Sequence, residues 1–206
     1  MSESDITDRS TPNPLLRFLR RLAGAGEATL TGDAELLRRF VATRDRSAFE
    51  LLLWRHGPMV LQVCRSVLHD AHDADDAFQA AFLVLARKAG SIGRREALGA
   101  WLYRVAYRIA VKLHQQRRRR TRCEQQGLDL PAVGEETPAC DPAVADEIKR
   151  LLHAEVERLP AKYRAPVVLC YLEGRTNEEA AAQLGWSKGT VSGRLARARD
   201  LLRRRL

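Results

Sequence analysis

Apolar side chains recur every three to four residues from position 33 onward, which predicts a series of α-helices and no strand. The pair Gly57-Pro58 is expected to break or kink the second helix, because proline removes a backbone donor. A third helix carries an apolar stripe at i, i+3, i+4 and i+7. The stripes of the first three helices contain Leu36, Leu37, Phe40 and Val41, then Phe49, Leu52 and Leu53, then Phe78, Ala81, Phe82 and Leu85.

The longest helix is predicted from Leu98 to Arg120 and has two different faces. Its apolar stripe is Leu98, Trp101, Leu102, Val105, Ile109 and Leu113. A ladder of cations, Arg104, Arg108 and Lys112, lies on another face with a spacing of one helical turn, and Tyr103 and Tyr107 lie beside it. The helix therefore offers one face to a core and another to a polyanion.

Residues 176–199 carry the signals of a helix-turn-helix. Thr176 and Glu179 form a capping box, Gly185 ends the first helix, and Ser187 caps the second. The second helix would enter the major groove of DNA. Its candidate DNA-binding residues are Ser187, Lys188, Thr190, Arg194, Arg197 and Arg199. The plainer alternative is a helical hairpin with a solvated basic face.

Charge is divided unevenly along the 206 residues, which together carry +9. Residues 31–123 carry +9 and residues 148–206 carry +7, whereas residues 124–147 carry −7 and contain no lysine or arginine. Prolines and glycines in this acidic stretch favour an extended tether. We therefore expect an all-α fold with two small helical domains, 31–122 and 148–206, the second a helix-turn-helix. A flexible acidic linker, 123–147, joins them, and a flexible tail, 1–30, precedes them.

Several classes of function are disfavoured by what the sequence lacks. It has no apolar run of about 18 residues, so stable membrane insertion is not expected. Its four cysteines form no C-x-x-C pair and follow no secretory signal, which favours a cytoplasmic protein without a zinc site. His69 and His72 lie near Asp70 and Asp73, but further metal ligands are missing. No phosphate-binding loop or nucleophile elbow is present, so we expect neither a cofactor nor an enzyme.

Acidic residues at 70, 73, 75 and 76 exceed what one helix cap needs, and the motifs around them resemble a known family. Residues 73–83 (DADDAFQAAFL) and 100–106 (AWLYRVA) resemble one domain of the extracytoplasmic-function sigma factors of bacterial RNA polymerase. Residues 171–181 (YLEGRTNEEAA), 189–191 and 194–199 resemble their promoter-reading domain. The two sets occur in the family's order and cover roughly residues 33–122 and 146–204.

The resemblance implies a transcription initiation factor that binds core RNA polymerase and promoter DNA, recognises the −10 and −35 elements, assists strand opening, and is restrained by an anti-sigma factor. The implied polymerase-docking residues are Asp73, Asp75, Asp76, Gln79 and Phe82. Ala80 stands where the family usually has Glu, which removes one carboxylate from the docking helix. The implied single-strand contacts at the −10 element are Ser91, Arg94, Arg95, Tyr103, Arg104, Tyr107, Arg108 and Lys112.

Two alternative functions, and two interpretations of the linker, stay open at this point. A helix-turn-helix regulator that binds duplex DNA without directing polymerase would leave the acidic cluster unexplained. A basic RNA-binding protein would account for the arginines at 117–122 but not for the helix-turn-helix. The linker either imitates RNA in the polymerase channel, as the resemblance suggests, or is a solvated tether.

Overall fold

The computed structural model describes residues 31–93, 97–125 and 142–206. Every regular element in these ranges is helical, which confirms the all-α prediction. The predicted tail, 1–30, and most of the predicted linker lie outside the described residues. Where the ends of that linker are described they are helical, because one helix runs to Gln125 and another begins at Pro142.

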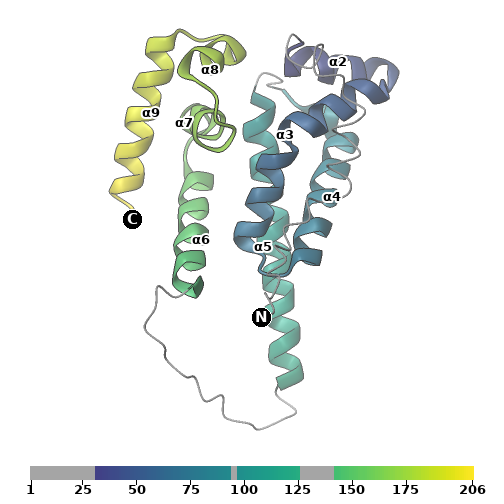
Figure 1. The fold of residues 1–206 in the computed structure, drawn as a ribbon, viewed down its shortest axis with the longest axis vertical. Coiled ribbons are helices and arrows are strands. Elements are labelled where there is room, and N and C mark those ends of the chain that lie inside the picture. The colour runs from purple at the N-terminus through teal and green to yellow at the C-terminus, as the bar shows by residue number, and fades with distance from the viewer. Residues whose placement is uncertain (1–30, 94–96, 126–141) are drawn as a thin grey trace, which may run out of the picture.

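Four helices and a short 3₁₀ turn build the N-terminal domain (Figure 1). They are α2 (Asp33–Thr43), α3 (Arg46–Val67), α4 (Ala71–Lys88), η1 (Ala89–Ser91) and α5 (Leu98–Gln125). Aspartates cap two of them: Asp45 accepts from two backbone N–H groups at the start of α3, and Asp70 does the same for α4. Pro58 lies inside α3 without ending it, so of the predicted break or kink at Gly57-Pro58 the break is wrong.

The C-terminal domain consists of α6 (Pro142–Arg158), α7 (Ala161–Val167), a π-helical turn η3 (Val168–Leu172), α8 (Asn177–Leu184) and α9 (Lys188–Arg203). The predicted capping box is present, since Thr176 Oγ1 accepts from Glu179 N and Glu179 accepts from Thr176 N. Gly185 ends α8 with φ +65°, and Ser187 accepts from Thr190 N at the start of α9. The helix-turn-helix prediction is confirmed.

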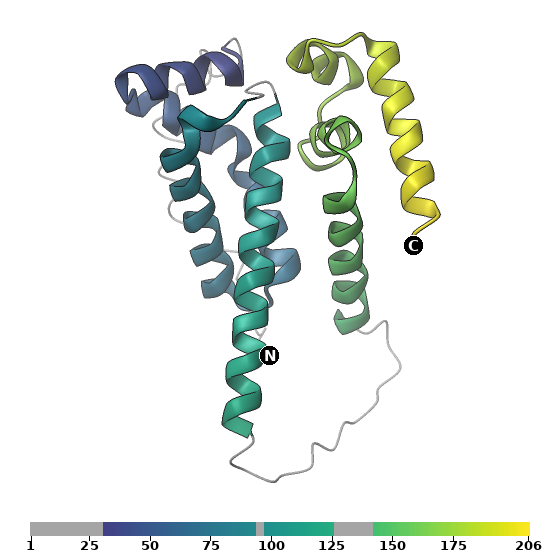
Figure 2. The ribbon, with the colours of Figure 1, turned by 180° about the vertical axis from the view of Figure 1, so that it is seen from behind.

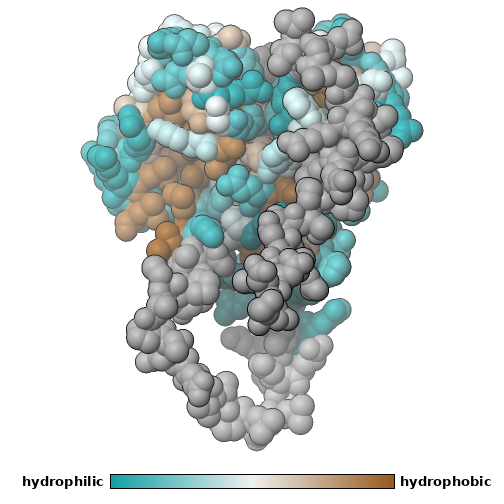
Figure 3. Space-filling model, in the orientation of Figure 1, coloured by the Kyte–Doolittle hydropathy of each residue, from teal (hydrophilic) through white to brown (hydrophobic). Residues whose placement is uncertain are grey.

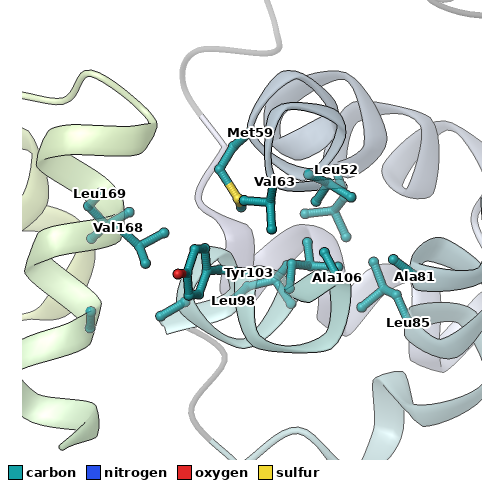
Figure 4. Close-up of a cluster of buried hydrophobic side chains, with 14 of the residues drawn as sticks. Leu52, Met59, Val63, Ala81, Leu85, Leu98, Tyr103, Ala106, Val168 and Leu169 are labelled. Atoms are coloured by element: carbon teal, nitrogen blue, oxygen red, sulfur yellow. The ribbon is translucent and has the colours of Figure 1, made fainter. Parts of the chain in front are cut away.

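The two domains lie against each other, and their cores are continuous. Helix α6 runs beside α3 and α5, as both ribbon views show (Figures 1 and 2). At the centre of the contact, Tyr103 of α5 lies between Leu98 of its own helix and Val168 and Leu169 of η3 (Figure 4). All four of these side chains are at most 1% exposed.

One face of the C-terminal domain keeps apolar side chains in solvent. Ile148, Leu151 and Leu152 of α6 are 60%, 51% and 41% exposed, and an apolar area lies over α6 and α9 in Figure 3. Among the described helices, none is both long and apolar enough to cross a membrane.

Candidate nucleic-acid interface

The cation ladder of α5 faces the C-terminal domain. Arg104 Nε donates to Glu157 Oε1 at 2.9 Å, and Arg108 Nε donates to the same oxygen at 3.0 Å. Glu157 also accepts from Arg164 of α7 at 3.2 Å. Lys112, one turn further along α5, is exposed. Two of the three predicted DNA-facing cations therefore share one carboxylate of the other domain.

The two tyrosines beside the ladder differ in their exposure. Tyr103 is completely buried; its hydroxyl donates to the carbonyl oxygen of His153 at 3.1 Å and lies 3.0 Å from His153 Nδ1. Burial raises the pKa of the Tyr103 phenol well above its ordinary value. Tyr107 is half-buried, with its ring stacked parallel to that of Tyr103 at a centroid distance of 6.4 Å. In this arrangement Tyr103 has no free face for a base.

The predicted strand-opening loop is described only in part. Ser91 is exposed and its hydroxyl donates to the carbonyl oxygen of Lys88 at 2.9 Å, whereas Arg94 and Arg95 lie outside the described residues. Ser91 borders a cleft of about 520 Å³ between the domains, whose lining includes Trp101 and Trp186. This part of the candidate −10 site thus opens toward the C-terminal domain.

The candidate docking residues of α4 differ in their exposure. Asp76 and Gln79 are exposed and Asp75 is half-buried. Asp73 forms an ion pair with Arg117 of α5 at 2.7 Å. Phe82 is only 4% exposed and packs against Phe78 and Phe49, with ring centroids 5.1 Å and 6.4 Å away. Phe82 is therefore a core residue in this structure.

Leu83 is an exposed residue of α4 that the sequence reasoning missed. Its side chain is 59% exposed, seven residues after Asp76 and four after Gln79, so the three share one face of the helix. The sequence did offer a signal of this exposure, because Leu83 falls outside the apolar stripe Phe78, Ala81, Phe82 and Leu85. A single exposed apolar residue is common on protein surfaces, so Leu83 becomes a candidate contact by its position on the same face as Asp76 and Gln79.

The predicted recognition helix, α9, holds several of its predicted DNA-binding residues in local contacts. The hydroxyls of Ser187 and Thr190 lie 2.9 Å apart. Lys188 forms an ion pair with Glu178 of α8, in which both side chains are well exposed. The Arg194 guanidinium lies over the Trp186 ring, 3.8 Å from its centroid. This stacking fixes the direction in which Arg194 leaves the helix.

Arg197 and Arg199 are exposed on α9 and complete the predicted basic surface of this helix. Exposed guanidiniums suit contacts with phosphates, which position a protein on DNA without reading its sequence.

Two histidines lie at the domain boundary, which the sequence did not suggest. His56 is completely buried between Asp33 and Glu173, and His153 is bonded to Tyr103. The rings of His69 and His114 lie edge to face, with their centroids 6.4 Å apart. Across the described ranges, no three His, Cys, Asp or Glu residues form a group that could hold a metal ion.

Comparison with known proteins agrees with the two-domain organisation. The family description "Sigma-70 region 2" matches residues 52–120, and "Sigma-70, region 4" matches residues 149–202. The chain is 36% identical over 183 residues to the ECF RNA polymerase sigma factor SigM of Mycobacterium tuberculosis, covering 89% of each chain. It is 30% identical over 181 residues to the RNA polymerase sigma-H factor of Pseudomonas aeruginosa, covering 82% of this chain and 91% of that one. The solved complex of CnrH with the cytosolic domain of CnrY matches 84% of this chain and 95% of that one, at 23% identity and a TM-score of 0.41.

Proposed function

The chain belongs to the ECF RNA polymerase sigma factors, and we propose that its two domains divide promoter-directed initiation between them. The N-terminal domain, 31–122, would bind core polymerase and open the −10 element, and the C-terminal domain, 148–206, would read the −35 element. The observation that carries this assignment is the complete helix-turn-helix, with both helices capped, on the same chain as an exposed acidic and apolar face of α4. A regulator that binds only duplex DNA would have no use for that face.

Polymerase docking would use the exposed part of α4. Asp75, Asp76 and Gln79 supply charge and hydrogen bonding, and Leu83 supplies an apolar centre. Asp73 would act in part by holding Arg117, and Phe82 supports the helix from the core. The family's additional carboxylate is missing here, because Ala80 takes its place.

Strand opening would use the loop after η1 together with the ladder of α5. Single-stranded DNA is held by a basic groove and by stacking on aromatic rings, at about 1 to 3 kcal/mol per stacked base. Arg104, Arg108 and Lys112 supply the groove, and Tyr107 and Tyr103 the rings. Ser91, Arg94 and Arg95 of the loop would hold the unstacked base and its phosphates.

Duplex reading would use α9, with Lys188, Thr190 and Arg194 toward base edges and Arg197 and Arg199 toward phosphates. The cap hydroxyl of Ser187 lies at the same end of the helix as the base-reading side chains. The polymerase performs the chemistry, so this chain would need neither a cofactor nor catalytic residues of its own. It would work in the cytoplasm, where an anti-sigma factor would restrain it.

Reconstitution with core polymerase tests this function. We expect the chain to form a complex with core polymerase and to direct run-off transcription from a subset of promoters. Asp76→Ala should weaken complex formation while leaving duplex binding by the C-terminal domain unchanged. A chain that binds duplex DNA but never starts transcription with core polymerase would contradict the proposal and favour the regulator.

The acidic linker has its own test. If it imitates RNA in the polymerase channel, replacing Glu135, Glu136 and Asp141 with neutral residues should change abortive synthesis and promoter escape. Unchanged promoter escape would show that the linker is a solvated tether.

A further inference from the structure

A buried polar cluster joins the two domains. His56 of α3 lies with Nε2 3.0 Å from Asp33 Oδ2 at the start of α2, and with Nδ1 2.8 Å from Glu173 Oε1, which follows η3 in the C-terminal domain. The side chains of His56 and Asp33 are completely buried and that of Glu173 is 5% exposed. Because both ring nitrogens face carboxylates, both must donate, and His56 carries a proton on each.

The neighbouring charged and polar groups complete the cluster from every side. Arg55 of α3 pairs with Asp33, and Gln183 of α8 donates to Asp33 Oδ2 at 2.8 Å. Arg175 Nε donates to Glu173 Oε2 at 3.4 Å. Two of these contacts, His56 to Glu173 and Gln183 to Asp33, cross between the domains. Separating the domains breaks both at once.

A second set of contacts lies over the proposed nucleic-acid face of α5. Glu157 accepts from Arg104 and Arg108, and His153 covers the hydroxyl of Tyr103. Three of the side chains proposed to hold a single strand are therefore engaged by α6. The arrangement in the structure and the contact with DNA exclude each other.

We propose that these contacts form an autoinhibitory latch, in which the C-terminal domain closes over α5 and must swing away before Tyr103, Arg104 and Arg108 can reach single-stranded DNA. The latch deepens the proposed function and rests on it. Its two halves have different roles. The buried cluster around His56 fixes the closed position, whereas Glu157 occupies the cations that DNA phosphates would neutralise.

Gly99 provides a way to open the latch without changing any proposed DNA contact. It lies at the start of α5, and a Cβ added there would collide with the carboxylate of Glu173. That carboxylate is held by His56 and Arg175, so a shift that makes room for the Cβ weakens these contacts. Alanine is at least as favourable as glycine in a helix, so Gly99→Ala should leave the N-terminal domain folded.

The matched control is Gly32→Ala. A Cβ at Gly32 meets no atom within 4 Å, and its φ of −69° is open to any residue. Glu157→Gln is a second variant, which keeps the shape of the side chain but removes the charge that Arg104 and Arg108 share with Arg164 of α7. The full chain is used throughout, and thermal unfolding verifies that each variant is folded.

Two readouts follow from the latch. Fluorescence energy transfer between dyes on exposed Gln62 of α3 and Lys162 of α7 reports the domain separation, and anisotropy of a labelled oligothymidylate reports single-strand affinity. We expect Gly99→Ala to change the transfer efficiency and to tighten oligonucleotide binding by about tenfold, the cost of a lost charged hydrogen bond. Glu157→Gln removes only partly exposed ion pairs, so it should tighten binding by at most about fivefold. Gly32→Ala should match the wild type.

The salt dependence of oligonucleotide binding distinguishes release of the cation ladder from a general loosening of the fold. Two freed arginines that each neutralise a phosphate should steepen the slope of log affinity against log salt by about 1.4, at about 0.7 per contact on a single strand. A folded Gly99→Ala variant with wild-type transfer efficiency, affinity or slope would overturn the latch, and so would a folded Glu157→Gln variant with wild-type affinity. Run-off transcription by the wild type with core polymerase is measured in parallel, since its absence would overturn the proposed function instead.

Discussion

The buried imidazolium of His56 predicts a loss of stability at alkaline pH. Burial alone would lower its pKa, but the carboxylates of Asp33 and Glu173 outweigh burial and raise the pKa from 6.5 to about 9. The native protein therefore binds one proton more than the unfolded chain between these values. The resulting stabilisation is fully present below about pH 6.5 and disappears as the pH rises through 9.

The size of the effect follows from that interval. Each pH unit over which the native state holds one extra proton contributes about 1.4 kcal/mol to the free energy of unfolding. Between pH 7 and 9, with both titrations incomplete at the ends, His56 should contribute a loss of about 2 kcal/mol. Buried thiols act in the same direction near pH 9, since burial and the Asp75 charge raise the pKa of Cys64 to about 12.

Comparison with His56→Gln isolates the contribution of His56 from that of the thiols. Glutamine is neutral, and with its amide nitrogen toward one carboxylate its oxygen faces the other, so the variant should be less stable than the wild type at pH 7. Chemical denaturation at pH 7, 8 and 9 should show this difference shrinking by about 2 kcal/mol, because only the wild type loses a proton at position 56. Parallel stability curves, or a His56 resonance that titrates near pH 6.5, would refute the reasoning.

Three further predictions test individual elements. Phe82→Ala should lower the free energy of unfolding by about 3 to 5 kcal/mol, whereas Leu83→Ala should change it by less than about 0.5 kcal/mol and weaken binding of core polymerase; equal effects on stability would contradict the assignment. Thr176→Ala should lower stability by about 1 kcal/mol in thermal unfolding, and Thr176→Ser should restore it. Arg194→Ala should cost about 1 to 3 kcal/mol on the preferred duplex and relax its sequence preference, whereas Arg199→Ala should weaken all duplexes alike in anisotropy titrations.

The helix-turn-helix was predictable because its signals are local. The capping box at Thr176 and the left-handed turn at Gly185 each depend on residues within four positions along the chain. Capping by Asp70 was predictable for the same reason. Local signals of this kind do not depend on how the rest of the chain folds.

The buried face of α5 was predicted only in part. Leu98 and Leu102 are buried as expected, but Trp101 is half-buried, and Tyr103 and Ala106 are buried in its place. The buried face is rotated because α5 packs against α3 and α4 on one side and against α6 and α7 on the other. A stripe read from one helix assumes a single core, so it missed the side that the second domain covers.

His56 and Glu173 are separated by 117 positions, and nothing local marks them as partners. His56 falls within an apolar stretch of α3, where a buried histidine bonded to its own surroundings is the ordinary expectation. Only the docking of the domains brings a second carboxylate to it. Arg104 and Glu157 are likewise 53 positions apart. From the sequence, Arg104 was assigned to a DNA-binding face and Glu157 to no site.

Closure of two positively charged domains needs an electrostatic explanation, since residues 31–123 carry +9 and residues 148–206 carry +7. Glu157 and Glu173 supply it by placing two of the C-terminal domain's carboxylates at the contact. They are not equivalent, because Arg104 and Arg108 are 42% and 61% exposed and pairs of this kind contribute at most about 1 kcal/mol. DNA phosphates can therefore replace Glu157 at little cost. Removing Glu173 from the buried imidazolium is the larger barrier, so the His56 cluster, not the ladder, should determine how often the closed form opens.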